Sequence, residues 1–301
     1  MRVLNFGSLN IDHVYKVDHI VVPGETISSD SLKFAPGGKG LNQSIALARS
    51  GVETYHVGCI GNDGDMLLKQ LKQAGVHTQY TTKKDTVTGH AMIQVNKDGQ
   101  NSILIYGGAN LELTREMVDA VLDEAEKPDM VLLQNETSQV HYIAEACRNR
   151  GIPVAFNPSP YSNSLKDFPY EAIQYLLINE TEGNQITEES TPEKIAASLM
   201  SQYPEMRVVL TLGSKGVYYQ DKKMSSSHNG FRVQAVDTTG AGDTFTGFFL
   251  GSILKGTEVG EALRWGCGAA ALSVTKSGAA LSIPEMEEVR QFLAEELGKT
   301  K

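Results

Sequence analysis

The sequence predicts an α/β protein with a doubly wound, mostly parallel sheet and a small antiparallel β lid. Three observations support this prediction. From residue 114 onward, short apolar strands alternate with helices, a pattern typical of parallel sheets. Polar residues follow the ends of these strands, at the edge where open α/β sheets bind ligands. The segments 13–36 and 88–107 instead alternate apolar and polar residues, which is typical of antiparallel strands.

The N-terminal third combines a buried strand with the two alternating segments. Val3 to Phe6 is predicted as the first strand and ends at Gly7. We then expect strands at 13–22 and 27–35, a helix at 41–50, a strand at 54–60, a helix at 65–74, and strands at 89–95 and 102–106. The two hairpins should pair into one small sheet that stands off the main body. Such a sheet favours covering a site or dimerisation.

The rest of the chain is predicted as regular βα units followed by helices. Strands are expected at 130–133, 154–156, 176–178 and 208–212. Helices are expected at 114–126, 138–150, 192–202, 245–254, 259–275 and 284–297, with a loop at 276–282. The length allows one large α/β domain or two smaller ones, and no internal repeat or low-complexity segment is present. We expect a single domain over residues 1–301, with the lid inserted in it.

Composition excludes several function classes. The 301 residues carry a net charge of −9, which argues against a nucleic-acid binder. The three cysteines, Cys59, Cys147 and Cys267, form no C-x-x-C pair and are expected to be core thiols in a reducing compartment. No apolar run approaches the ~18–20 residues needed to span a bilayer. We therefore expect a cytoplasmic protein without a membrane partner.

The segment 236–245 predicts a site for phosphoryl transfer. Gly240, Ala241 and Gly242 stand at the start of a predicted helix, whose first N–H groups can bind an anion. Asp243 falls in the first turn, where it can accept a proton from a hydroxyl held against the same groups. A cradle for the transferred group and a base for the acceptor are what such an enzyme needs. A simple glycine-containing helix cap remains the alternative.

Two further segments are candidates for binding a polar ligand. Asn10 and Asp12 lie two residues apart and would face the same side of an extended backbone, so both could bond one polyol. A turn with local side-chain hydrogen bonds has equal weight. Glycines at 37, 38 and 40 permit close approach of a ligand before a helix that begins near Asn42. This is not a Walker A loop, because Gly40 follows Lys39 where that motif needs Ser or Thr.

These segments together resemble the ribokinase-like (PfkB) carbohydrate kinases over nearly the whole chain. The segments 7–13 and 37–43 resemble the sugar-binding segments of that family, and 237–245 resembles its anion hole and catalytic base. The resemblance implies that Asp243 deprotonates a sugar hydroxyl as it attacks the γ-phosphate of ATP. The residues implied to bind the sugar are Asn10, Asp12, Gly38, Lys39, Asn42 and Glu136.

The same resemblance implies two cation sites and a dimer. Asn179 and Glu182 would organise Mg²⁺ and the phosphates, mainly through water, and Thr211, Gly213, Ser214 and Gly216 would line the nucleotide site. A K⁺ ion would stabilise the anion-hole loop from Asp237, Thr239, Ser273, Lys276, Gly278 and Ser282. The two alternating segments would form the lid and the clasp of a homodimer.

The identity of the sugar is left open by these residues. D-ribose, phosphorylated to ribose 5-phosphate, is the leading expectation; deoxyribose, fructose or a modified hexose is the alternative. Leu41 and Ser44 stand where the family often has alanine, which can reshape the pocket. A catalytically silent sensor is the alternative from another class, but the acid and the glycines are all present.

Overall fold

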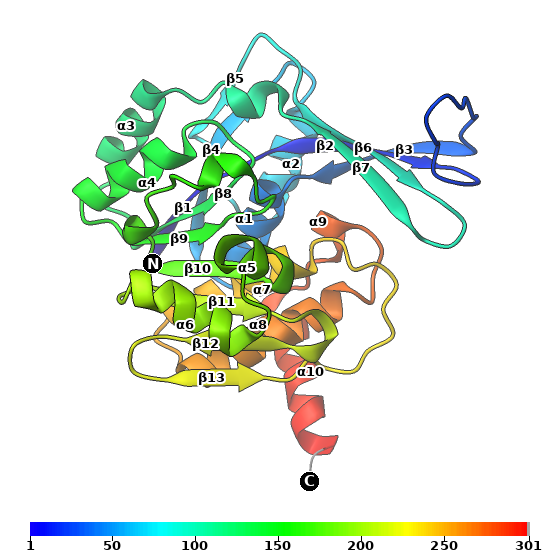
Figure 1. Cartoon of the computed structure of the whole chain (residues 1–301). Coiled ribbons are helices and arrows are strands. Elements are labelled where there is room, and N and C mark those ends of the chain that lie inside the picture. The colour runs from blue at the N-terminus through cyan, green and yellow to red at the C-terminus, as the bar shows by residue number, and fades with distance from the viewer. Residues whose placement is uncertain (300–301) are drawn as a thin grey trace.

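The main body is built on a sheet of nine strands (Figure 1). The computed structural model describes residues 1–299, so Thr300 and Lys301 of the predicted domain lie outside it. The strands of the main sheet are β1 (Arg2–Phe6), β4 (Glu53–Ile60), β5 (Thr81–Lys83), β8 (Met130–Gln134), β9 (Val154–Asn157), β10 (Tyr175–Asn179), β11 (Arg207–Thr211), β12 (Val217–Gln220) and β13 (Ser225–His228).

These strands follow the order β13-β12-β11-β10-β9-β8-β1-β4-β5. Only the pairs β11–β12 and β12–β13 are antiparallel. From β1 the chain passes to β4 on one side and later returns to β8 on the other, so the strand order reverses at β1. Ligands bind at the carboxyl ends of strands beside such a reversal. The prediction of a doubly wound, mostly parallel sheet is confirmed.

Helices cover both faces of this sheet. They are α1 (Lys39–Arg49), α2 (Asp65–Gln73), α3 (Arg115–Glu124), α4 (Val140–Asn149), α5 (Glu180–Thr187), α6 (Pro192–Gln202), α7 (Ala241–Leu254), α8 (Val259–Ser273), α9 (Ala279–Ser282) and α10 (Met286–Lys299). Short 3₁₀ helices span Gly108–Leu111, Asn163–Leu165, Tyr170–Ala172 and Gly213–Lys215. None of the helices within residues 1–299 combines the length and apolar character that crossing a bilayer requires.

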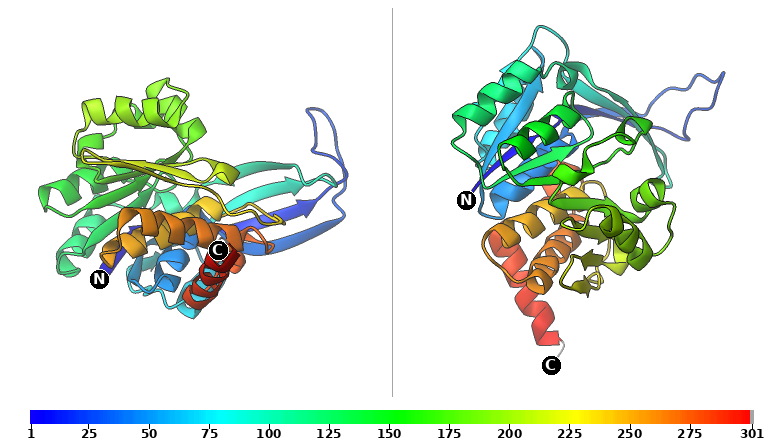
Figure 2. Two further views of the ribbon diagram at one scale, coloured as in Figure 1. Left: turned by 90° about the horizontal axis from the view of Figure 1, so that it is seen from below. Right: turned by 60° about the vertical axis from the view of Figure 1, so that its left-hand side comes forward.

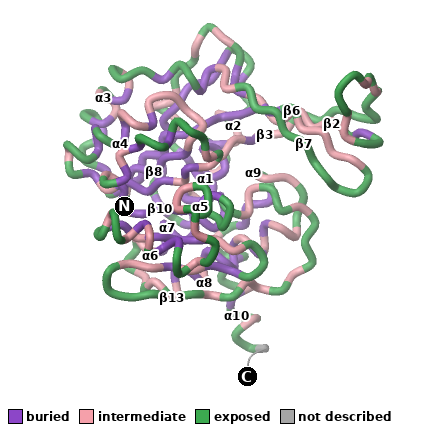
Figure 3. The backbone as a smooth tube through the Cα atoms, viewed as in Figure 1, coloured by how far each residue is buried: buried purple, intermediate pink, exposed green. Residues whose placement is uncertain are grey.

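Alternation along β1 assigns its side chains to two separate cores. Leu4 belongs to a core with side chains of α3, α4 and α6, whereas Val3 belongs to a core with side chains of α1, α7 and α8. Successive residues of a strand point to opposite faces of the sheet. The side chains of β1 therefore pack against the helices on both faces. Burial is concentrated in this sheet and its flanking helices (Figure 3).

The lid is a separate sheet of four strands that extends from one end of the body (Figure 2). Its strands are β2 (Asn10–Lys16), β3 (Ser31–Gly37), β6 (Gly89–Val95) and β7 (Asn101–Tyr106), in the order β3-β2-β6-β7. The outer pairs are antiparallel, as predicted, but β2 and β6 pair in parallel because both strands leave the body in the same direction. The expected single sheet is confirmed.

Several predicted elements differ from the structure. The first lid hairpin is shorter than predicted at 13–22 and 27–35, because a long irregular connection at 17–30 joins its strands. The predicted loop at 276–282 contains the single turn α9, which follows the positive-φ residue Gly278. Strands β5, β12 and β13 and helix α5 were not predicted. The Ser-rich β13 lacks an apolar run, and α5 begins with a polar capping box instead of an apolar stripe.

Candidate active site

The start of α7 has an open backbone cradle. Gly240 is the N-cap with a φ of 77°, a left-handed conformation that favours glycine. Within residues 1–299 no side chain caps this helix start. A Cβ added to Gly242 would meet nothing within 4 Å, so there is space in front of the first turn. Amides at the positive end of a helix beside open space suit an anion.

Asp243 lies in the first turn of α7 and is 7% exposed. Its two carboxylate oxygens accept hydrogen bonds from the first turns of α1: Asn42 Nδ2 donates to Oδ2 at 2.9 Å, and Gln43 Nε2 donates to Oδ1 at 2.8 Å. Each carboxylate oxygen has a second lone pair, so the group can still take a proton. Packing of α1 against α7 therefore holds the predicted base in a defined orientation.

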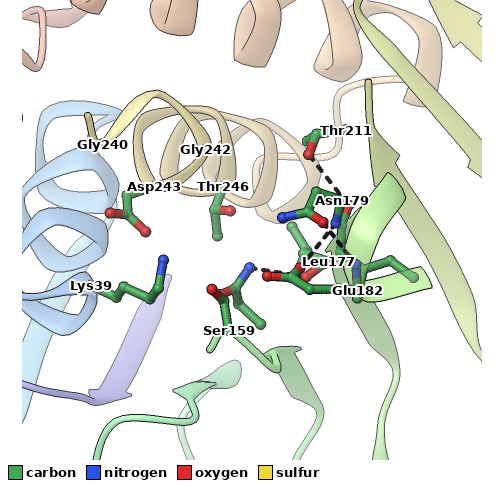
Figure 4. Close-up of a pocket in the computed structure, with 12 residues that line it drawn as sticks. Lys39, Ser159, Leu177, Asn179, Glu182, Thr211, Gly240, Gly242, Asp243 and Thr246 are labelled. Atoms are coloured by element: carbon green, nitrogen blue, oxygen red, sulfur yellow. Dashed lines mark hydrogen bonds between the residues drawn. The ribbon is translucent and has the colours of Figure 1, made fainter. Parts of the chain in front are cut away.

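A cavity of about 110 Å³ connects this carboxylate to the predicted nucleotide residues (Figure 4). Asp243, Gly240 and Gly242 line one side, and Lys39 projects beside them. Thr246 of α7 lies beside Asp243, and the cavity is also lined by Asn157, Ser159, Leu177, Ile178, Asn179, Glu182 and Thr211. Residues far apart in the sequence thus meet at the carboxyl ends of the strands.

Lys39 supplies a positive charge to this cavity from a half-buried side chain. Burial alone would lower the pKa of its ammonium group, but the carboxylates of Asp243, Glu136 and Glu182 act in the opposite direction, and the net pKa of Lys39 is raised. The side chain is therefore charged at neutral pH. A cation in this position balances the three acids and can attract phosphate.

Asn179 and Glu182 form the start of α5. The Asn179 side chain accepts from the Glu182 backbone N–H at 2.9 Å, and the Glu182 carboxylate accepts from the Asn179 N–H at 3.0 Å. This reciprocal capping box orients both side chains at the cavity wall. Nearby, Asn157 Oδ1 is buried with no hydrogen-bond partner among the described residues. A carboxylate and amide oxygens fit a hydrated Mg²⁺ ion, a hard cation that prefers oxygen.

The predicted sugar residues gather where the lid joins the body. Asn10 and Asp12 share one face of β2, as their spacing predicts, and Asp12 lies against Gly37 of β3. A Cβ at Gly37 would come within 2.1 Å of Asp12 Oδ2, so only glycine leaves room for this carboxylate. The Asn10 side chain accepts from Asn110 Nδ2 at 2.8 Å.

Glu136 links the body to the start of α1. Its carboxylate accepts from the Ser8 hydroxyl and, at 3.1 Å, from the backbone N–H of Lys39. Burial raises the pKa of Glu136, and Asp243 adds to this effect, whereas Lys39, Ser8 and the Lys39 amide lower it; the net pKa is raised. Gly38, with a φ of 94°, makes the turn that brings these groups together.

The predicted nucleotide loop only partly reaches the cavity. Thr211 lines it, but Gly213, Ser214 and Gly216 are not among its lining residues. Gly216 has a structural reason of its own: its φ is 109°, and a Cβ would approach His228 O to 2.0 Å. The role of these three residues at a nucleotide stays a prediction.

The residues predicted to hold K⁺ join two neighbouring loops. Asp237 accepts from the backbone N–H groups of Thr239 and Gly278, both at 2.9 Å. Ser273 and Ser282 donate to backbone carbonyls within their own helices, and Lys276 pairs with Glu288 at 2.8 Å. The Asp237 carboxylate is the kind of oxygen ligand that a hard cation prefers, while Lys276 can contribute only its carbonyl oxygen. The Asp237 bridge stabilises the loop before α7 directly.

Some site residues were not singled out from the sequence. Thr246 lies three residues after Asp243 and shares its helix face, a signal that was available. The sequence pointed to Gln43 only as the last residue of the segment 37–43, and gave it no role of its own. Asn110 and Ser159 carry no local signal, because long-range packing alone brings them to the site.

A family model, curated relatives and solved structures all show similarity to the same family of proteins. The family model described as pfkB family carbohydrate kinase matches residues 2–286. The ribokinase of Haemophilus influenzae is 39% identical over 95% of this chain and 96% of its own length. The crystal structure of ribokinase from Thermotoga maritima has a TM-score of 0.87 at 36% identity, covering 97% of this chain and 99% of that one. Arabidopsis thaliana ribokinase complexed with ribose and ATP has a TM-score of 0.84 at 32% identity, covering 97% and 98%.

Proposed function

The chain belongs to the pfkB family of carbohydrate kinases, and on this basis we propose that it transfers the γ-phosphoryl group of ATP to the primary hydroxyl of D-ribose. The product would be ribose 5-phosphate. The observation that carries this proposal is the pairing of Asp243 with the uncapped start of α7, in a cavity shared with Asn179, Glu182 and Lys39. A base, an anion cradle and a nearby cation suit phosphoryl transfer.

In the proposed reaction, Asn10, Asp12, Gly38, Asn42 and Glu136 hold the sugar so that its primary hydroxyl faces Asp243. The Asp243 carboxylate takes the hydroxyl proton as the oxygen attacks the γ-phosphate. The amides at the start of α7 and the Lys39 ammonium stabilise the charge on the transferring group, while the leaving ADP lies toward Thr211. Mg²⁺, held through water by Asn179 and Glu182, would neutralise phosphate charge.

We also propose that K⁺ stimulates the reaction from the Asp237 side of the loop before α7. The bonds from Thr239 and Gly278 to Asp237 support this, because they tie the loop of the anion cradle to its neighbour. A monovalent cation among these oxygens would stabilise the loop without contacting the substrate. A cytoplasmic location is proposed from the three free, buried cysteines, which suit a reducing compartment.

The proposed function is tested by ADP release from Mg-ATP with ribose, deoxyribose, fructose and hexose derivatives, each in potassium and in sodium buffer. We expect the highest kcat/KM with ribose and stimulation by potassium. If only another sugar were phosphorylated, that sugar would be the substrate, and the protein would still be a kinase. Absence of turnover with every acceptor would contradict the proposed activity and favour a silent sensor.

We expect sugar binding to depend on the ionisation of Asp12. Burial, and then the nearby Glu136 carboxylate, raises the pKa of Asp12 to about 7. The ionised group accepts hydrogen bonds at both oxygens, so it should bind sugar hydroxyls better than the protonated form. The KM for sugar should therefore fall about tenfold between pH 6 and pH 8, following the ionised fraction. The measurement is KM against pH for the wild type and Asp12→Asn; a slope that persists in the variant would contradict the assignment.

We propose that the chain forms a homodimer through one face of the lid. Leu32, Phe34, Met92, Leu104 and Tyr106 expose their side chains and alternate onto the same face of the lid sheet; we call this set the clasp face. Such an apolar patch favours burial against a second copy.

Leu104→Lys is expected to dissociate this dimer, because Leu104 is 68% exposed within the clasp face and a lysine there would be buried without a partner. Light scattering after size exclusion measures the mass. Leu297→Lys is the matched control, since Leu297 is 56% exposed but lies on α10. A monomeric wild type, or equal dissociation of both variants, would refute the clasp.

A further inference from the structure

We propose that Gln43 is a positioning residue for Asp243, and that a directional chain of buried amide hydrogen bonds holds its donor toward the carboxylate. The inference rests on the proposed kinase function, because it assigns Asp243 as the base. It concerns a side chain with no place in the binding sets described above. Gln43 is 0% exposed and acts through Asp243, not on a substrate.

Asn42 and Gln43 make similar bonds to Asp243 but face different surroundings. Asn42 Oδ1 is buried and has no hydrogen-bond partner among the described residues, so its capacity to accept is unused. Gln43 Oε1 instead accepts from Gln134 Nε2 at 2.7 Å, which directs the far side of its amide into the protein. Gln43 is therefore committed to orienting the base, whereas Asn42 can serve both the base and the ligand.

The orientation of the Gln43 amide follows from a chain that begins at a backbone carbonyl. Gly40 O can only accept, so Asn5 must direct its Nδ2 toward it, at 2.8 Å. Asn5 Oδ1 then faces Gln134 and accepts from its Nε2 at 2.8 Å. The same Gln134 nitrogen donates to Gln43 Oε1, which leaves the Gln43 nitrogen facing Asp243. Each amide has one allowed orientation, so donor and acceptor atoms are fixed by the network.

A second branch of the chain supports the same direction. Asn5 Nδ2 also donates to Ser44 Oγ at 2.8 Å, and Ser44 Oγ lies 2.8 Å from His56 Nδ1. Burial lowers the pKa of His56 to about 4, so its ring is neutral at physiological pH and Nδ1 can accept from the serine hydroxyl. Asn5, Ser44 and His56 are all 0% exposed. The chain is thus anchored in the core and ends at the candidate active site.

This arrangement fixes the plane of the Asp243 carboxylate. The terminal torsion of aspartate is intrinsically broad, so the group needs bonds at both oxygens to keep one orientation. With Gln43 removed, only Asn42 would hold the carboxylate, through one oxygen. Misorientation of a base lowers the rate of proton transfer without removing contacts that bind the sugar.

Gln43→Met tests the inference, because methionine fills a similar volume and cannot donate. We expect kcat to fall about 10–100-fold, with the sugar KM and the calorimetric affinity for sugar changed less than about threefold. The acid limb of the kcat profile should move to higher pH, since the anionic carboxylate has lost a donor. Ser50→Ala is the control: Ser50 is also buried at the end of α1, but its hydroxyl donates to Leu47 O and not to Asp243, so its variant should keep kcat and the pH profile.

Gln134→Met tests the chain itself, one link further from Asp243. It frees the Gln43 amide to rotate, so kcat should fall less than in Gln43→Met, and the double variant should be no slower than Gln43→Met. Unchanged kcat in Gln43→Met, or additive losses in the double variant, would overturn the inference.

A failure of the proposed function gives a different result. In that case the wild type itself shows no turnover, and a crystal structure of Gln43→Met decides the inference separately. A carboxylate of Asp243 that has turned from its wild-type position supports the positioning role, and an unmoved carboxylate overturns it.

Discussion

Replacing Asp243 by asparagine is expected to lower kcat about 10³-fold while sugar binding is retained. The amide cannot accept the hydroxyl proton, and the cradle at the start of α7 remains. Turnover is measured by ADP release and sugar affinity by calorimetry. Asp119→Asn is the matched control, since Asp119 bonds Tyr142 and Arg150 away from the cavity and its variant should retain activity.

The Asp243→Asn variant should also lose stability, for a reason specific to this site. Asn42 and Gln43 both donate to the carboxylate, and an asparagine has only one accepting atom. One donor would then face another donor, at a cost of about 1–3 kcal/mol in the free energy of unfolding. Thermal denaturation measures this loss. Near-normal turnover in a folded variant would disprove the assignment of Asp243 as the base.

Lys39→Met is expected to lower kcat/KM for ATP about 10²–10³-fold. The substitution removes the positive charge that the carboxylates of Asp243, Glu136 and Glu182 stabilise, so these three groups would face the phosphates without a counter-charge. Both the binding of ATP and the transfer step should therefore weaken.

Steady-state kinetics with varied ATP measures the effect of Lys39→Met. Lys255→Met provides the control, because Lys255 donates to Ser50 O and is not among the residues that line the cavity. Similar losses in the two variants would indicate a general cost of removing a lysine, not a role at the phosphates.

The parts of the fold that the sequence predicted are those in which local pattern and long-range packing agree. Most strands of the parallel sheet are short apolar runs, and the lid strands alternate, so these were assigned; the polar β5 was missed. Helix α5 was not predicted, because its capping box at Asn179 and Glu182 replaces the apolar stripe that helix prediction needs. The Ser-rich β13 forms only because β12 offers it an antiparallel partner.

The candidate site could be predicted where its functional residues are adjacent in the sequence. Gly240, Gly242 and Asp243 stand together in the sequence, and the structure places them around one cavity. The partners of Asp243 lie 200 and 201 residues away in sequence, so no local pattern could assign them. Asn157 Oδ1 was recognised as a possible cation ligand only from the structure, which shows it buried without a hydrogen-bond partner among the described residues.

The directional amide chain restricts how this sequence can drift over evolutionary time. Gln134 donates to both Asn5 and Gln43, and each of these donates onward, so a change at any one position leaves a neighbouring buried group unpaired. Such a loss costs about 1–3 kcal/mol, a large part of the stability of a typical domain. Neutral exchange at these positions therefore requires joint substitution, and descendants of this sequence should change the three residues together or keep all three.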